Sequence, residues 1–102
     1  MISLFKNLFN KEQVDVAAKL AEGAIIVDVR TPGEFATGHV KGSINIPLND
    51  IQNHVNDLKS KNKVIITVCR SGARAGSATS FLRNAGIETY NAGSWNSVQA
   101  LV

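Results

Sequence analysis

Short runs of apolar residues alternate along this chain with longer stretches in which apolar residues recur at helical spacing. The short runs are rich in valine and isoleucine and are bounded by glycine, proline or polar residues, which is typical of buried strands. They predict four strands, at residues 24–29, 43–46, 63–68 and 87–91. The third strand has the clearest pattern, and Pro47 ends the second.

The stretches between these runs predict helices. The first covers residues 12–22 and ends at Gly23, a typical helix stop. Its expected inward face consists of Val14, Ala17, Ala18 and Ala21. The later helical segments are a turn opened by residues 31–34, a helix capped by Asn49 or Asp50, a helix over residues 74–85 and a final turn within residues 93–101.

Strands that alternate with helices of this length predict an α/β fold, in which a small parallel β-sheet is flanked by helices on both faces. The chain has 102 residues, of which 44% are hydrophobic and 19% charged, so it can fill one core. We expect a single domain over residues 11–102. Residues 1–10 are a separate N-terminal segment, which we expect to pack on the domain or to be a flexible end rather than to bind a membrane surface.

Charge and cysteine content narrow the function. A net charge of +3 favours anionic ligands, but the eleven lysines and arginines are scattered, which argues against nucleic acid. The single cysteine allows no internal disulfide, and with two distant histidines it makes no zinc site, so no metal or cofactor is expected. A free thiol fits the cytoplasm, and no apolar stretch is long enough to span a membrane, so no membrane partner is expected.

That cysteine, Cys69, directly follows the clearest strand and begins the Cys69 loop, residues 69–74. Ligands of parallel sheets bind at the carboxyl ends of the strands, where we expect this loop to lie. Arg70, Arg74, the N-terminus of the next helix and inward-turned N–H groups would all favour the thiolate, the reactive form of cysteine. A lone cysteine at a strand end is usually a buried apolar residue, but these neighbours favour a nucleophile.

The sequence of the Cys69 loop, Cys-Arg-Ser-Gly-Ala-Arg, resembles the active-site loop of the rhodanese family of thiosulfate sulfurtransferases. Residues 28–35 (DVRTPGEF) and 38–47 (GHVKGSINIP) resemble two further segments of that family, in the same order. The three segments span most of the chain, which resembles the small single-domain members. Two departures concern the outer wall of the pocket: Ala92 precedes Gly93 where the family often has two glycines, and Val98 stands where an aromatic residue is common.

The resemblance implies sulfur transfer in two steps. The Cys69 thiolate attacks the outer sulfur of thiosulfate, sulfite leaves, and a persulfide forms. A thiophilic acceptor then takes this sulfur, and cyanide, a cellular thiol or a protein cysteine would serve. The resemblance assigns anion and sulfur binding to Arg70, Ser71, Gly72, Ala73 and Arg74. Candidates for the pocket rim are Asp28, Arg30 and Trp95.

Four of the candidate side chains also have structural interpretations. Arg74 either binds the anion or pins the loop through an ion pair with Asp28 or Glu34. Asp28 is expected to be structural at its strand end, and Trp95 is expected to cover the edge of the core. His39 lies between two glycines, and we expect it to stabilise that turn rather than to act as a base.

Other functions use a similar loop. Cysteine phosphatases place five residues between cysteine and arginine, whereas four separate Cys69 from Arg74, which suits a ring around one sulfur atom. A non-enzymatic rhodanese-like binding module and a protein-to-protein sulfur-relay carrier, loaded by a protein persulfide, remain open alternatives. A reductase is disfavoured because no second cysteine could resolve its intermediate.

Overall fold

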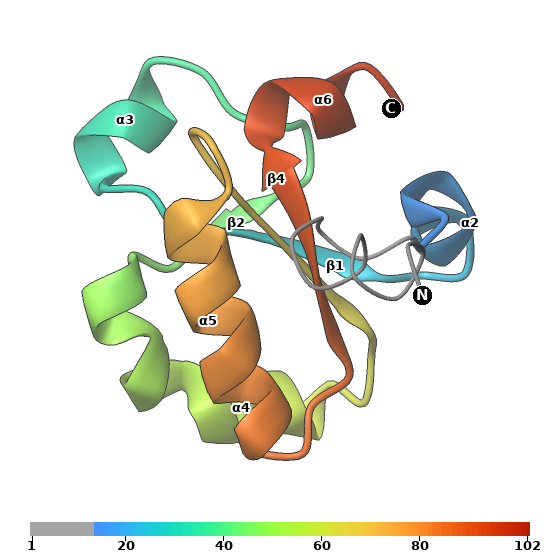
Figure 1. Ribbon diagram of the computed structural model, residues 1–102, viewed down its shortest axis with the longest axis vertical. Helices are drawn as coiled ribbons and strands as arrows, with labels where there is room; N and C mark the ends of the chain where they lie inside the picture. The colour runs from blue at the N-terminus through green and yellow to red at the C-terminus, as the bar shows by residue number, and fades with distance from the viewer. Residues whose placement is uncertain (1–13) are drawn as a thin grey trace, which may run out of the picture.

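The computed structural model describes residues 14–102. Its centre is a four-stranded sheet in the order β2-β1-β3-β4, in which every neighbouring pair is parallel (Figure 1). The strands are β1 (Ile25–Asp28), β2 (Ile44–Asn45), β3 (Ile65–Cys69) and β4 (Thr89–Ser94). The predicted α/β fold with a small parallel sheet is confirmed.

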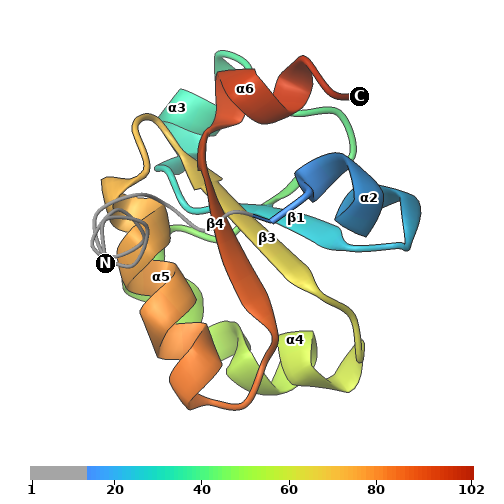
Figure 2. The same ribbon diagram turned by 45° about the vertical axis from the view of Figure 1, so that its right-hand side comes forward.

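Helices cover both faces of this sheet (Figure 2). They are α2 (Val16–Ala21), α3 (Pro32–Ala36), the 3-10 helix η1 (Leu48–His54), α4 (Val55–Ser60), α5 (Ala73–Asn84) and α6 (Trp95–Gln99). α2 and α6 pack on one face, whereas η1, α4 and α5 pack on the other. Within residues 14–102, no helix is both long enough and apolar enough to cross a bilayer.

Alternating side chains along β1 and β3 divide the core into two clusters. Val27 and Ile65 belong to the cluster on the α5 side, whereas Ile26 and Ile66 belong to the cluster on the α2 side. Cys69 is part of the α5-side cluster. The strand that carries the cysteine is therefore held by apolar packing on both of its faces.

The first helix differs from its prediction. α2 packs through the larger side chains of Val16 and Leu20, four residues apart, whereas Ala17, Ala18 and Ala21 are exposed. Alanine covers little surface, so the two larger side chains decide which face turns inward. Residue 12, where the predicted helix began, and the N-terminal segment 1–10 lie outside the described residues.

The predicted helix cap at Asn49 or Asp50 is wrong. The segment begins directly after Pro47 as η1 and continues as α4. The Asp50 carboxylate instead accepts a hydrogen bond from Asn53 at 2.7 Å and contacts His54 at 3.0 Å. These two side chains occupy the oxygens that a cap would need.

The two outer strands also differ from their predicted bounds. β2 has two residues rather than four, and β4 covers Thr89–Ser94 instead of residues 87–91. A shift in the pairing of β3 with β4 places Ser94 opposite Cys69. The end of β4 therefore lies beside the Cys69 loop.

Candidate active site

The sulfur of Cys69 faces backbone N–H groups. Cys69 ends β3 and is 1% exposed. Its Sγ accepts the N–H of Gly72 at 3.0 Å and the N–H of Ala75, in the first turn of α5, at 3.4 Å. Two donors at a helix N-terminus stabilise negative charge on the sulfur.

Gly72 shapes this turn. It has φ of +105°, a conformation that L side chains rarely adopt, and it stands immediately before α5. A Cβ added at Gly72 would lie 3.4 Å from the Cα of Gly93. The backbone conformation therefore favours glycine at this position, and β4 lies in van der Waals contact with it.

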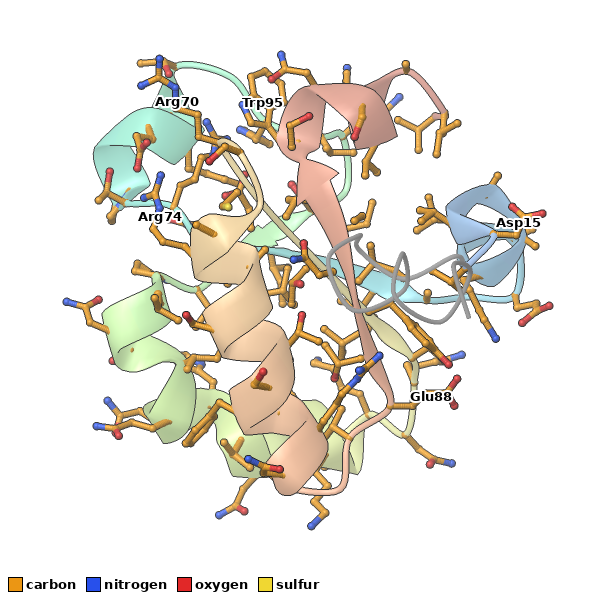
Figure 3. All side chains as sticks on the ribbon, in the orientation of Figure 1. Asp15, Arg70, Arg74, Glu88 and Trp95 are labelled. Atoms are coloured by element: carbon orange, nitrogen blue, oxygen red, sulfur yellow. The ribbon has the colours of Figure 1, made fainter. Side chains whose placement is uncertain are left out.

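The two arginines of the loop have different environments. Arg74 makes a two-pronged ion pair with Glu34, at 2.7 Å to Oε1 and 3.0 Å to Oε2. Arg70 is exposed, and among residues 14–102 no carboxylate forms an ion pair with it. Figure 3 shows Arg74 between α3 and α5, and Arg70 at the outer end of the molecule. Of the two roles considered for Arg74, the structure contains the ion pair, and its partner is Glu34 rather than Asp28.

The ion pair alters the titration of both partners. Hydrogen bonds from Arg74, and then from the Thr31 backbone, lower the pKa of Glu34 to about 2. Glu34 in turn raises the pKa of Arg74, with smaller contributions from Cys69 and Asp28. Glu34 also completes a capping box with Thr31 at the start of α3. A single carboxylate thus links α3 to the Cys69 loop.

The remaining loop residues lie at its surface. Ser71 and Ala73 are exposed, and Ala73 is the first residue of α5, one position earlier than predicted. Beneath them, the buried hydroxyls of Thr67 and Thr79 meet at 2.7 Å, and Thr79 donates to the carbonyl of Ala75 at 2.8 Å. This pair ties the first turn of α5 to β3.

The candidate rim residues at the end of β1 form a closed cluster. The Arg30 guanidinium, 4% exposed, binds the fully buried Asp28 carboxylate, with Nη2 at 2.6 Å from Oδ2. It also donates to the carbonyl of Gly38 at 2.7 Å and lies 4.8 Å from the ring centre of Trp95. Asp28 and Arg30 are therefore engaged with the protein itself, and Trp95, half-buried against the α2-side cluster, covers them.

His39 bonds within its own turn. Its Nδ1 lies 2.8 Å from the carbonyl oxygen of Phe35, and its ring stacks on that of Phe35 with centres 3.7 Å apart. Among residues 14–102, no group of three histidine, cysteine or acidic side chains could hold a metal ion.

Sequence reasoning missed Asn91. Its Nδ2 donates to the carbonyl of Gly72 at 3.0 Å, and its Oδ1 accepts the N–H of Gly93 at 2.8 Å. A polar residue at the end of a predicted buried strand was a signal that could have marked it. The two departures from the family pattern lie in the core: Ala92 is 5% exposed and Val98 is 1% exposed.

Comparisons with known proteins identify similar chains and folds. A family model described as Rhodanese-like domain matches residues 6–101. The uncharacterized protein YqhL of Bacillus subtilis is 38% identical over 69 residues, which cover 67% of this chain and 54% of YqhL. Thiosulfate sulfurtransferase PspE of Escherichia coli K12 is 33% identical over 61 residues, 59% of each chain.

A solved structure of a rhodanese with anions from E. coli has a TM-score of 0.66 at 30% identity and covers 72% of this chain and 89% of its own. The chain spans between half and three-fifths of the length of YqhL and PspE. The family match, by contrast, covers nearly all of the present chain, and the fold agrees with it. The protein belongs to the rhodanese-like domain family.

Proposed function

We propose that this protein is a sulfurtransferase that carries sulfane sulfur as a persulfide on Cys69. The observation that carries the proposal is the sulfur of Cys69, which accepts N–H groups from Gly72 and Ala75. The family membership and the name of PspE, a thiosulfate sulfurtransferase, support it. Thiosulfate is the proposed donor, and a thiophilic small molecule or a protein thiol is the proposed acceptor.

The reaction has two displacements at sulfur. The Cys69 thiolate attacks the outer sulfur of thiosulfate, the sulfur–sulfur bond of thiosulfate breaks, and sulfite leaves with the bonding electron pair. The acceptor, for example cyanide, then attacks the outer sulfur of the persulfide. The bond to Sγ breaks, thiocyanate leaves, and the electron pair returns to Cys69 as thiolate. In both steps, sulfane sulfur passes from one nucleophile to another without an external oxidant or reductant, so the reaction requires no metal or redox cofactor.

The loop residues divide into two roles. Arg70 is exposed and free of ion pairs within residues 14–102, so it is the proposed binding residue for the sulfite part of thiosulfate. Arg74 is engaged by Glu34 and is proposed to hold the loop in place. Gly72 and Ala75 supply donors to the sulfur, and the small residues Ser71 and Ala73 leave the loop mouth open.

The size of the loop favours sulfur over phosphate chemistry. Gly72 and Ala75 already reach the single Sγ atom with their N–H groups. A phosphate would have to fit three oxygens inside the Cys69 loop. This loop has one residue fewer than that of cysteine phosphatases, so it suits a single sulfur atom better. With one thiol and no partner cysteine, the protein is proposed to act in a reducing compartment such as the cytoplasm.

The test is thiocyanate formation from thiosulfate and cyanide by the reduced protein and by Cys69→Ser. We expect thiosulfate to add the mass of one sulfur atom to the intact protein, cyanide to remove it, and Cys69→Ser to lose both reactions. Ser80→Ala, at an exposed position of α5, is the matched control and should behave as the unmodified chain.

A folded, reduced protein that gains no sulfur from any donor would contradict the proposal. If a cysteine persulfide loads Cys69 but thiosulfate does not, the protein is a sulfur-relay carrier rather than a thiosulfate sulfurtransferase.

A further inference from the structure

The side-chain amide of Asn91 joins two segments, β4 and the Cys69 loop, beside the cysteine. Asn91 is half-buried in β4, its Nδ2 donates to the Gly72 carbonyl in the Cys69 loop, and its Oδ1 accepts the N–H of Gly93. The two bonds, at 3.0 and 2.8 Å, use both ends of the amide. Only asparagine or glutamine offers a donor and an acceptor in this arrangement, and the shorter of the two fits here.

The residue that Asn91 holds is the one that contacts the sulfur. Gly72 donates its N–H to Sγ at 3.0 Å, while its carbonyl accepts both Asn91 and the N–H of Gly76, the latter at 2.8 Å. Glycine has the least conformational preference of any residue, so its own backbone does not fix this orientation. The amide of Asn91 adds a second hydrogen bond to this carbonyl from outside the loop, next to the one from Gly76, and so limits how far Gly72 as a residue can move from the sulfur.

The surrounding glycines leave space for this amide. A Cβ added at Gly76 would lie 3.4 Å from Asn91 Nδ2, and one at Gly72 would lie 4.0 Å from both amide atoms. Gly93 approaches Gly72 closely, as described above, and its N–H completes the bonding of Asn91. The amide thus lies in van der Waals contact with Gly72 and Gly76, and within residues 14–102 its hydrogen bonds go to Gly72 and Gly93.

We propose that Asn91 is a positioning residue that holds Gly72 so that its N–H group is ready to stabilise the anionic sulfur of Cys69. The inference rests on the proposed sulfurtransferase function and deepens it, because it assigns the preformed state of the sulfur site to a residue on another strand. Preorganised donors need no rearrangement during the reaction, so loss of the holding contact lowers the rate rather than substrate binding.

The test compares Asn91→Leu and Asn91→Asp with Asn45→Leu. Asn45 is a matched control, because its amide also donates to backbone carbonyls, those of Asp28 and Arg30 at the end of β1, and not to the Cys69 loop. One measurement is the rate of Cys69 alkylation by iodoacetamide as a function of pH, and the other is the rate of persulfide formation from thiosulfate.

Both Asn91 variants should shift the alkylation profile to higher pH, because the thiolate loses part of its stabilisation. The kcat should fall by about tenfold to a hundredfold, less than the ~100- to 1,000-fold loss typical when an oxyanion donor is removed outright. The KM for thiosulfate should change little. Asn91→Asp keeps the shape of the side chain but cannot donate. Measuring it at low and high salt separates the lost hydrogen bond from the charge of the new carboxylate, which salt screens, so it reports on the hydrogen bond where Asn91→Leu folds poorly.

The inference is overturned where the folded Asn91 variants lose thermal stability but keep the alkylation profile and kcat of the Asn45→Leu control. Failure of the proposed function is a separate result: the unmodified chain would then form no persulfide, while the alkylation profiles would still report whether Asn91 orients the site.

Discussion

The ends of the neighbouring strands β1 and β3 each carry an arginine, but the two arginines have opposite environments. At the end of β1, Asp28 and Arg30 satisfy each other beneath Trp95, and the cluster is closed. At the end of β3, the sulfur of Cys69 accepts two backbone N–H groups, and Arg70 is exposed to solvent. The first region pairs its charges within the protein, whereas the second, under the proposed function, presents a thiolate and an exposed cation to the substrate. A pair of opposite charges near a site is therefore not by itself evidence of catalysis.

The largest expected effect in the closed region is on stability. Arg30→Met leaves the Asp28 carboxylate fully buried without its partner, which should lower the free energy of unfolding by about 3–5 kcal/mol. Urea denaturation measures this loss, and Lys41→Met, an exposed cation elsewhere, is the control. A loss below that of an ordinary surface substitution would show that the two regions do not differ as described.

The corresponding change in the open region should affect binding and leave stability unchanged. Arg70→Met removes an exposed cation with no ion pair in residues 14–102, so the urea midpoint should not move. The KM for thiosulfate should rise about tenfold, because a hydrogen bond to a charged group is worth ~1.5 kcal/mol. Steady-state kinetics at low and high salt check this, since the rise should shrink as salt screens the arginine. An unchanged KM at low salt would remove Arg70 from the proposed substrate site.

The smallest effect concerns the ion pair that links the two regions. The pKa of Glu34 lies at about 2, below its ordinary value of 4.5, so its stabilising contribution is complete above about pH 4.5 and is lost as the pH falls towards 2. Glu34→Gln should therefore be less stable than the unmodified chain at pH 6, and the difference should shrink between pH 4.5 and pH 2. Urea midpoints across this range measure it. A difference that is constant with pH would mean that the carboxylate charge of Glu34 does not contribute.

The central features of the fold were predictable because they depend on local pattern. The apolar run of β3 and the glycine and arginine residues behind Cys69 indicated both the sheet and the loop. The inward face of α2 was predicted wrongly because spacing alone treats alanine and leucine alike, although burial of Val16 and Leu20 gains much more.

The contacts that organise the site could not be predicted in the same way. Glu34 and Arg74 are 40 positions apart, and Asn91 is 19 positions from Gly72, so both contacts depend on how the strands align. The shift that places Ser94 opposite Cys69 has no signature in the spacing of β4. Sequence therefore predicted the candidate nucleophile, while the residues that contact its loop became visible only in three dimensions.

The near-complete burial of Cys69 has a consequence for the choice of acceptor. Only 1% of the residue is exposed, so the outer sulfur of a persulfide would be the atom nearest to the medium. Under the proposed function, an acceptor would have to reach this sulfur past the Cys69 loop, in which Ser71, Gly72 and Ala73 are small. The loop would then select acceptors by size. A small nucleophile would reach the sulfur directly, whereas a protein acceptor would need its cysteine on a protruding loop.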